Sequence, residues 1–271
     1  MAVALLPLLG LYFGNRGSAP QLWDANHPDA APRPQRLDEN ERGDCAGSWI
    51  DKLRFAERKV YSQNQEDGIT LSLIEHVKPK NKFFVEFGTE AGNEVNTRVL
   101  RGLPDWQGLL LDGSNENPSI NLHKTMIKAD TIASVFKEHN VPLDLALLSV
   151  DIDSYDYWVL TAILDAGYKP DIIITEVNSQ LGYTECLTVP PASETGKAFL
   201  IPGAVNFGVS VPLYASFAEK HGYTMVYCES LGVNCFYVRT EYVEASLRKS
   251  CPVGRKAYVH KSCPAMSASC T

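Results

Sequence analysis

The sequence lacks the glycine pattern GxGxxG, the cysteine pair CxxC and any dense cluster of lysine and arginine. The first absence argues against an NAD-dependent oxidoreductase, and the second argues against a zinc site of the usual spacing. With 25 basic and 32 acidic residues the net charge is −7, so the chain has no electrostatic footprint for nucleic acid or anionic lipid. We therefore expect a small-molecule or protein substrate and no nucleic-acid partner.

The sequence also lacks an apolar run of the roughly 20 residues that a membrane-spanning helix needs. The N-terminal run over residues 1–13 is shorter and resembles the apolar part of a secretory signal, and the small residues 17–19 suit cleavage. A positively charged leader is missing, because Arg16 follows the run. We predict a signal- or anchor-like segment over residues 1–20. It implies a secretory or membrane-associated location, or docking into a larger complex; an organellar or cytoplasmic location is the alternative.

Composition divides the rest of the chain into three parts. Residues 21–48 are rich in proline and polar residues, which is typical of a linker. Residues 49–240 form the predicted globular domain, and residues 241–271 form a cysteine-containing tail. Four of the seven cysteines lie outside the predicted core, at Cys45, Cys251, Cys263 and Cys270. They either staple the domain ends as disulfides in an oxidising compartment or remain free thiols.

Within residues 49–240, short apolar runs alternate with helical patterns. The runs are continuous, which indicates strands buried on both faces of a mostly parallel sheet. We predict an α/β, Rossmann-like three-layer sandwich with an antiparallel C-terminal hairpin. The expected strands are 82–87, 108–111, 125–128, 143–150, 171–177, 224–228 and 234–238; the expected helices are 65–76, 94–101, 132–139, 155–166 and 211–221. In such a sheet the ligand lies beyond the carboxyl ends of the strands.

The first two expected strands end in residues that suit a nucleoside cofactor. Glu86 is followed by Gly88 and Gly92, which allow close approach of the backbone to a ligand, although a simple tight turn explains them equally well. Asp112 follows 24 residues after Gly88, where a carboxylate is well placed to bind a ribose diol. Asp130, after the third strand, is a candidate contact for an adenine amino group.

Carboxylates gather after the fourth and fifth strands. Asp151 and Asp153 follow the fourth strand, and Glu176 and Asn178 follow the fifth. Neighbouring strand ends would bring these oxygen ligands together, as Mg²⁺, Mn²⁺ or Ca²⁺ prefers. The alternative is that Asp153 or Ser154 caps the next helix while Asp151 contacts substrate or cofactor directly.

Taken together, these motifs resemble class I S-adenosylmethionine-dependent methyltransferases, and more narrowly the FkbM-type O-methyltransferases. The likeness covers about residues 58–240. It rests on the segments 61–69, 84–88, 94–98, 108–113, 150–158, 208–211, 222–223 and 232–239.

The resemblance implies S-adenosylmethionine as cofactor and methyl transfer to a hydroxyl, with a small molecule or glycan-like acceptor. It also implies which residues line the cofactor: Glu86, Gly88 and Gly92 at the methionine end, Asp112 with Gly113 and Ser114 at the ribose, Asp130 at the adenine and Asp151 at the reacting centre. FkbM-type members carry Asp-Val-Glu-Gly after the fourth strand, whereas residues 151–154 here read Asp-Ile-Asp-Ser. This segment is also similar to the metal-dependent catechol-type O-methyltransferases, and that likeness leaves a divalent cation as an open alternative.

Several roles stay open at this point. The base that takes the hydroxyl proton is Asp151, Asp153 or Glu176, unless a cation lowers the pKa of the hydroxyl instead. His123, His139 and His221 are further candidate bases, although a histidine near the C-terminal end of a helix is usually structural. The long segment 179–206 is expected to select the acceptor. The non-enzymatic alternative is an inactive methyltransferase-like scaffold or subunit.

Overall fold

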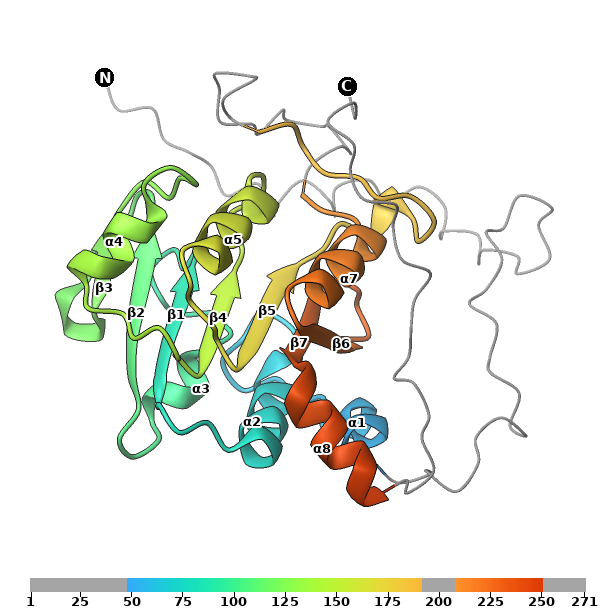
Figure 1. Ribbon diagram of the computed structural model, residues 1–271. Helices are drawn as coiled ribbons and strands as arrows, with labels where there is room; N and C mark the ends of the chain where they lie inside the picture. The colour runs from blue at the N-terminus through green and yellow to red at the C-terminus, as the bar shows by residue number, and fades with distance from the viewer. Residues whose placement is uncertain (1–47, 192–207, 251–271) are drawn as a thin grey trace, which may run out of the picture. The chain divides into compact units, whose positions relative to one another are not determined.

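The computed structural model describes residues 48–191 and 208–250 of the 271-residue chain, with side chains up to residue 245 (Figure 1). The signal- or anchor-like segment 1–20, almost all of the linker and the end of the tail lie outside the described residues. Segment 179–206 lies partly outside them. Over residues 48–191 and 208–250, no helix is both long enough and apolar enough to cross a bilayer.

The described residues form a seven-stranded sheet in the order β3-β2-β1-β4-β5-β7-β6. Its strands are β1 (Phe83–Phe87), β2 (Gln107–Asp112), β3 (Leu122–Lys124), β4 (Leu147–Val150), β5 (Ile172–Glu176), β6 (Tyr223–Cys228) and β7 (Asn234–Arg239). Strands β1 to β5 pair in parallel, whereas β7 is antiparallel to both β5 and β6. The predicted α/β fold with an antiparallel C-terminal hairpin is confirmed.

Helices cover both faces of this sheet and complete the three layers (Figure 1). One face is covered by α4 (Ile132–Glu138), α5 (Asp156–Asp165) and α7 (Val211–Lys220). The other is covered by α1 (Trp49–Lys52), α2 (Glu66–Val77), α3 (Arg98–Arg101) and α8 (Thr240–Ser250). Helix α8 begins at Thr240, the last residue of the predicted domain, and continues into the segment assigned to the tail, where Val243 packs into the core of this second face.

The continuous apolar runs explain why both faces are covered. Successive side chains of a strand point to opposite faces, so Leu147 and Leu148 of β4 enter different cores. The chain builds outward from β1 to β3 and then returns to place β4 on the other side of β1. Strand order therefore reverses between β1 and β4, which is where a ligand site is expected in a sheet of this kind.

Two expected elements differ from the observed ones. The third strand is Leu122–Lys124, not 125–128, because the fully buried Leu122 pairs with Leu110 in the sheet. The helix expected at 94–101 covers only α3, since the N–H groups of Asn96 and Thr97 donate to the Glu86 carboxylate instead.

Candidate functional site

Gly88 brings the ends of three strands together. Its φ is +68°, and a Cβ built on it would lie 1.6 Å from the carbonyl oxygen of Asp151, so no side chain fits there. Its N–H donates to the carbonyl of Leu111 at 3.1 Å. The carboxyl ends of β1, β2 and β4 therefore meet at this glycine.

The turn that follows Gly88 is held by its own backbone and by an arginine. The N–H of Gly92 donates to the carbonyl of Thr89 at 2.7 Å, and Arg101 donates to the carbonyl of Gly92 at 2.6 Å. The Thr89 hydroxyl is buried and has no hydrogen-bond partner among the described residues. A buried polar atom of this kind calls for an explanation, and a ligand bound along the turn would supply one.

Asp112 joins the turn over residues 88–92, the glycine turn, to the loop after β2. Its Oδ2 accepts a hydrogen bond from the N–H of Glu90 at 2.9 Å, while its Oδ1 accepts from the N–H groups of Ser114 and Asn115 at 2.7 and 2.8 Å. The Asn115 amide donates to the same Oδ1 at 2.9 Å. Oδ2 therefore has capacity for one more donor on the side of the glycine turn.

The other expected cofactor residues differ in their surroundings. Gly113 and Ser114 are exposed next to Asp112, and a Cβ on Gly113 would meet only Met126, at 3.9 Å. Asp130 is exposed in the loop before α4, as expected for a residue that needs no buried partner. The side of the loop at Gly113 is therefore open next to Asp112.

The carboxylate of Glu86 accepts hydrogen bonds from other residues of the chain. Its Oε1 accepts from the N–H of Asn96 at 2.8 Å, and its Oε2 accepts from the N–H and the hydroxyl of Thr97 at 2.9 and 2.5 Å. Burial raises the pKa of Glu86, and these bonds, followed by the charge of Arg101, offset part of that rise. The sequence placed Glu86 at the correct strand end, but it did not predict that the Glu86 carboxylate holds Asn96 and Thr97 of the segment 94–98.

Asp151, Asp153 and Glu176 form an acid cluster at the ends of β4 and β5, with carboxylate oxygens within 4.8 Å of one another. Burial, and then neighbouring carboxylates, raise the pKa of Asp151 well above its usual range and that of Glu176 to about 8. Three carboxylates this close repel one another unless a proton or a cation lies among them.

One further residue, Asp156, holds the loop that carries Asp151 and Asp153. Asp156, the first residue of α5, accepts the N–H groups of Ile152 and Ser154 at 2.8 and 2.9 Å. Burial raises the pKa of Asp156 to about 6. The N-cap of α5 is Tyr155, so neither Asp153 nor Ser154 caps this helix.

Asn178 follows β5 and begins the next turn. It is buried, and its side-chain oxygen accepts from the N–H of Gln180 at 3.0 Å, so it caps the turn Ser179–Leu181. Its backbone N–H donates to the carbonyl of Val209 at 2.9 Å, which ties the start of α7 to the end of β5. Its role as a metal ligand stays a prediction.

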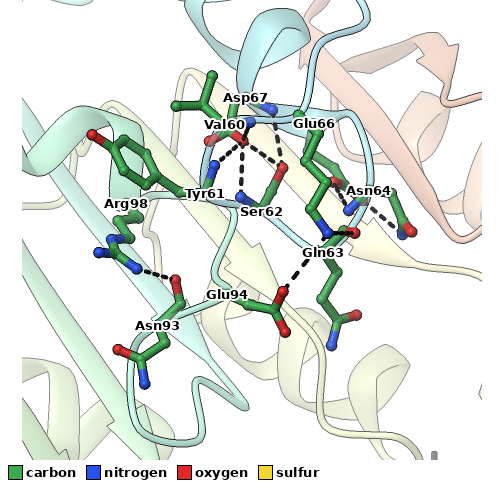
Figure 2. Close-up of polar contacts among 11 residues, drawn as sticks. Val60, Tyr61, Ser62, Gln63, Asn64, Glu66, Asp67, Asn93, Glu94 and Arg98 are labelled. Carbon is green, nitrogen blue, oxygen red and sulfur yellow. Dashed lines mark hydrogen bonds and ion pairs between the residues drawn. The ribbon is translucent and has the colours of Figure 1, made fainter.

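A second carboxylate-held turn precedes α2, and Figure 2 shows it. Oδ2 of Asp67 accepts the three successive N–H groups of residues 60–62, each at 2.8 Å. This fixes Tyr61, whose ring lies under the guanidinium of Arg98, 4.7 Å from the ring centroid. Arg98 in turn donates to the carbonyl of Asn93 at 2.6 Å. The sequence segment 61–69 thus comprises this turn and the first residues of α2, and it is attached to the loop after the glycine turn.

The three histidines do not join the acid cluster in a hydrogen bond. His123 and His139 stack on each other with ring centroids 4.4 Å apart. His221 follows α7 and lines a cavity of about 410 Å³ at the amino edge of β5, together with Tyr168, Lys169 and Arg239. The carboxylates therefore remain the candidate bases.

No family model and no curated protein matches the chain. Among solved structures, one similar chain is the N-terminal domain of EvdMO1, determined in the presence of SAH and D-fucose. It shows 12% identity and a TM-score of 0.38, over 70% of this chain and 92% of that one. Another is the O-methyltransferase TomG from Streptomyces achromogenes in complex with SAM, with 16% identity and a TM-score of 0.33 over 71% and 89%. Because these identities and TM-scores are low, the comparisons assign no role to any residue of this chain. Such roles are argued from the geometry of the chain itself.

Proposed function

We propose that the chain is an S-adenosylmethionine-dependent methyltransferase that methylates a hydroxyl oxygen of a small-molecule or glycan-like acceptor. The observation that carries this proposal is the direct attachment of the glycine turn to Asp112, through the 2.9 Å hydrogen bond from Glu90. The same turn contacts the backbone of Asp151 at Gly88, so a nucleoside held by Asp112 would end beside the acid cluster. The FkbM-type motifs support the same assignment.

The residues present fit this cofactor. The free capacity of Asp112 Oδ2 suits a ribose hydroxyl, the open side of Gly113 suits the nucleoside, and the exposed Asp130 is the proposed contact for the adenine. The orphaned Thr89 hydroxyl suits the amino-acid end. Glu86 then acts by shaping the loop through Asn96 and Thr97, and not by touching the cofactor.

S-adenosylmethionine, when bound, supplies a methyl group on a positively charged sulfur. The chain's own task is to align the acceptor hydroxyl with that group and to accept its proton. Asp151 and Glu176 are the proton acceptors in this proposal, because their raised pKa values bring a carboxylate base nearer to neutral pH. A divalent cation held by Asp151, Asp153 and Glu176 would lower the pKa of the hydroxyl and relieve the repulsion among the three carboxylates.

Calorimetry with S-adenosylhomocysteine tests the cofactor site. Replacing Asp112 by asparagine should weaken binding by about 10- to 100-fold, about 1.4–2.7 kcal/mol. Glu116→Gln is the matched control, because it removes one charge from an exposed side chain of the same loop. If the wild-type chain binds no S-adenosylhomocysteine, the inactive scaffold replaces this proposal.

Titration of the wild-type chain with Mg²⁺ tests the cation. Asp151→Asn should abolish binding, whereas Asp165→Asn, an exposed carboxylate at the end of α5, should not change it. Absence of Mg²⁺ binding in the wild type would leave Asp151 and Glu176 with the role of base alone.

We also propose that the chain functions in an oxidising compartment, in keeping with the predicted signal- or anchor-like segment. Cys228 and Cys235 form a disulfide across the β6–β7 hairpin, and Cys186 is disulfide-bonded as well. All three cysteines of the described residues are therefore oxidised, which is typical of secreted proteins. Mass spectrometry of the unreduced protein checks this, and free thiols at these positions would contradict it.

A further inference from the structure

Asn234, the first residue of β7, lies directly beside Glu176 of the acid cluster. The two residues are partners in the antiparallel ladder of β5 and β7. In this ladder the N–H of Val177 donates to the carbonyl of Val233 at 2.8 Å. The backbone N–H and carbonyl of Asn234 bond instead to Glu229, which follows β6 on the other side. Glu176 and Asn234 are therefore a non-hydrogen-bonded pair, whose Cα atoms lie about 4.5 Å apart with their side chains close together.

Both side chains point to the face of the sheet that α2 covers. Side chains two residues apart on a strand share a face, and Ile174 and Phe236 pack in the core on the α2 side. Glu176 and Asn234, two residues from these, therefore point to the same side. Asp151 joins them from the end of β4, because its carboxylate oxygen lies within 4.8 Å of that of Glu176. The three residues form a row across the ends of β4, β5 and β7, with Glu176 in the middle.

The side-chain amide of Asn234 is held in one orientation. Its Nδ2 donates to Oε1 of Glu66 at 2.9 Å, and the fully buried Glu66 also accepts the N–H of Asn64 at 2.9 Å. A carboxylate can only accept, so the amide oxygen is turned away from Glu66. This oxygen is buried and makes no hydrogen bond with any described residue, and Asn234 as a whole is only 4% exposed. An unpaired acceptor at such depth is unfavourable, which points to a ligand of the site as its partner.

We propose that the side-chain oxygen of Asn234 is a ligand of the cation that the acid cluster binds, in the role predicted for Asn178. This inference rests on the cation part of the proposed function. Neighbouring strands lie about 4.8 Å apart, so a cation over Glu176 has Asp151 and Asn234 on either side. Each is within reach of a short side chain and a metal–oxygen bond of about 2.0–2.6 Å. Amide oxygens suit such cations, whereas that of Asn178 already accepts the N–H of Gln180.

Calorimetric titration with Mg²⁺ tests the ligand in three variants. Asn234→Ala removes the oxygen, whereas Asn234→Asp keeps an oxygen there, and both lose the hydrogen bond to Glu66. Asn234→Ala should bind Mg²⁺ at least about 10-fold more weakly than the wild type, because even a partner behind the metal ligands contributes about 10- to 100-fold. Asn234→Asp should bind Mg²⁺ at least as tightly as the wild type. Glu66→Gln is the control: it disturbs the same anchor, since one acceptor oxygen replaces two, but it keeps the Asn234 oxygen and should match the wild type.

Urea unfolding without Mg²⁺ separates the role of ligand from a structural role. All three variants should be less stable than the wild type, because each weakens the contact between β7 and α2. Only Asn234→Ala should combine this loss with weaker Mg²⁺ binding. For a variant too unstable for calorimetry, the rise in unfolding temperature on adding Mg²⁺ gives the same comparison.

An equal loss of Mg²⁺ affinity in the three variants would show that Asn234 only anchors α2, and it overturns the inference. So does wild-type affinity in Asn234→Ala; if Asp151→Asn still abolishes binding, the cation site itself stands. A wild type that binds no Mg²⁺ overturns the inference together with the cation part of the proposed function. A wild type that binds Mg²⁺ but no S-adenosylhomocysteine overturns only the methyltransferase proposal.

Discussion

Replacing Gly88 by alanine tests the contact on which the candidate site depends. Two costs add. The left-handed backbone, at φ +68°, costs alanine about 1–2 kcal/mol. The new Cβ would lie 1.6 Å from the carbonyl oxygen of Asp151, where ordinary contact begins at 3.4 Å, so the ends of β1 and β4 must separate. Overpacking of this kind costs about 1–3 kcal/mol more. The expected loss in the free energy of unfolding is therefore about 2–5 kcal/mol.

Two other glycines separate the backbone cost from the overpacking cost when the three variants are unfolded in urea. Gly167 has φ +92° and no atom within 4 Å of the position that a methyl group would take, so Gly167→Ala should lose only the backbone part, about 1–2 kcal/mol. Gly102 has an ordinary φ of −88° and open space, so Gly102→Ala should change stability by less than about 1 kcal/mol. Equal losses for Gly88→Ala and Gly167→Ala would refute the contact between Gly88 and Asp151, and with it the convergence of the three strand ends.

Three further changes test neighbouring parts of the structure. Because the pKa of Glu176 is raised to about 8, the folded chain holds a proton between about pH 4.5 and 8 that the unfolded chain has lost. The free energy of unfolding should therefore fall as pH rises, by up to about 1.4 kcal/mol per pH unit, and urea titrations of Glu176→Gln should show a flatter dependence; an unchanged slope would contradict the shift. Cys228→Ser should lose about 2 kcal/mol under oxidising conditions and match the reduced wild type; an equal loss with and without reductant would contradict a role for the disulfide. Asp67→Asn keeps an acceptor but loses its charge, and should cost about 1–2 kcal/mol in urea unfolding, against no change in Glu116→Gln.

The buried parallel strands were predictable from sequence because each is a continuous apolar run. β1, β4 and β5 were located within a few residues for this reason. The short edge strand β3 was misplaced, because a strand with one fully buried residue, Leu122, leaves almost no periodic signal. The hairpin of β6 and β7 followed from two short apolar segments around a glycine-containing loop.

The sequence predicted which residues stand at the strand ends of the candidate site, but not which groups their side chains contact. Glu86 and Asp112 stand at strand ends, where the sequence placed them. Their partners are backbone N–H groups of Asn96, Thr97 and Glu90, and every residue except proline carries such a group. Sequence patterns therefore contain no trace of these bonds, and the ligand contacts predicted for Glu86 and Asp112 stay predictions.

Backbone hydrogen bonds separate two kinds of carboxylate near the candidate site. Those that hold loops accept N–H groups of the chain: Glu66, Asp67, Glu86, Asp112, Asp156 and Glu229. Among the described residues, no backbone N–H donates to the carboxyl groups of Asp151, Asp153 or Glu176, although the first and last are largely buried. A buried carboxyl group without such donors either takes up a proton and becomes neutral or keeps its charge by binding a cation. The acid cluster is therefore where exchange of a proton or binding of a cation is chemically favoured, and the loop-holding carboxylates define its shape.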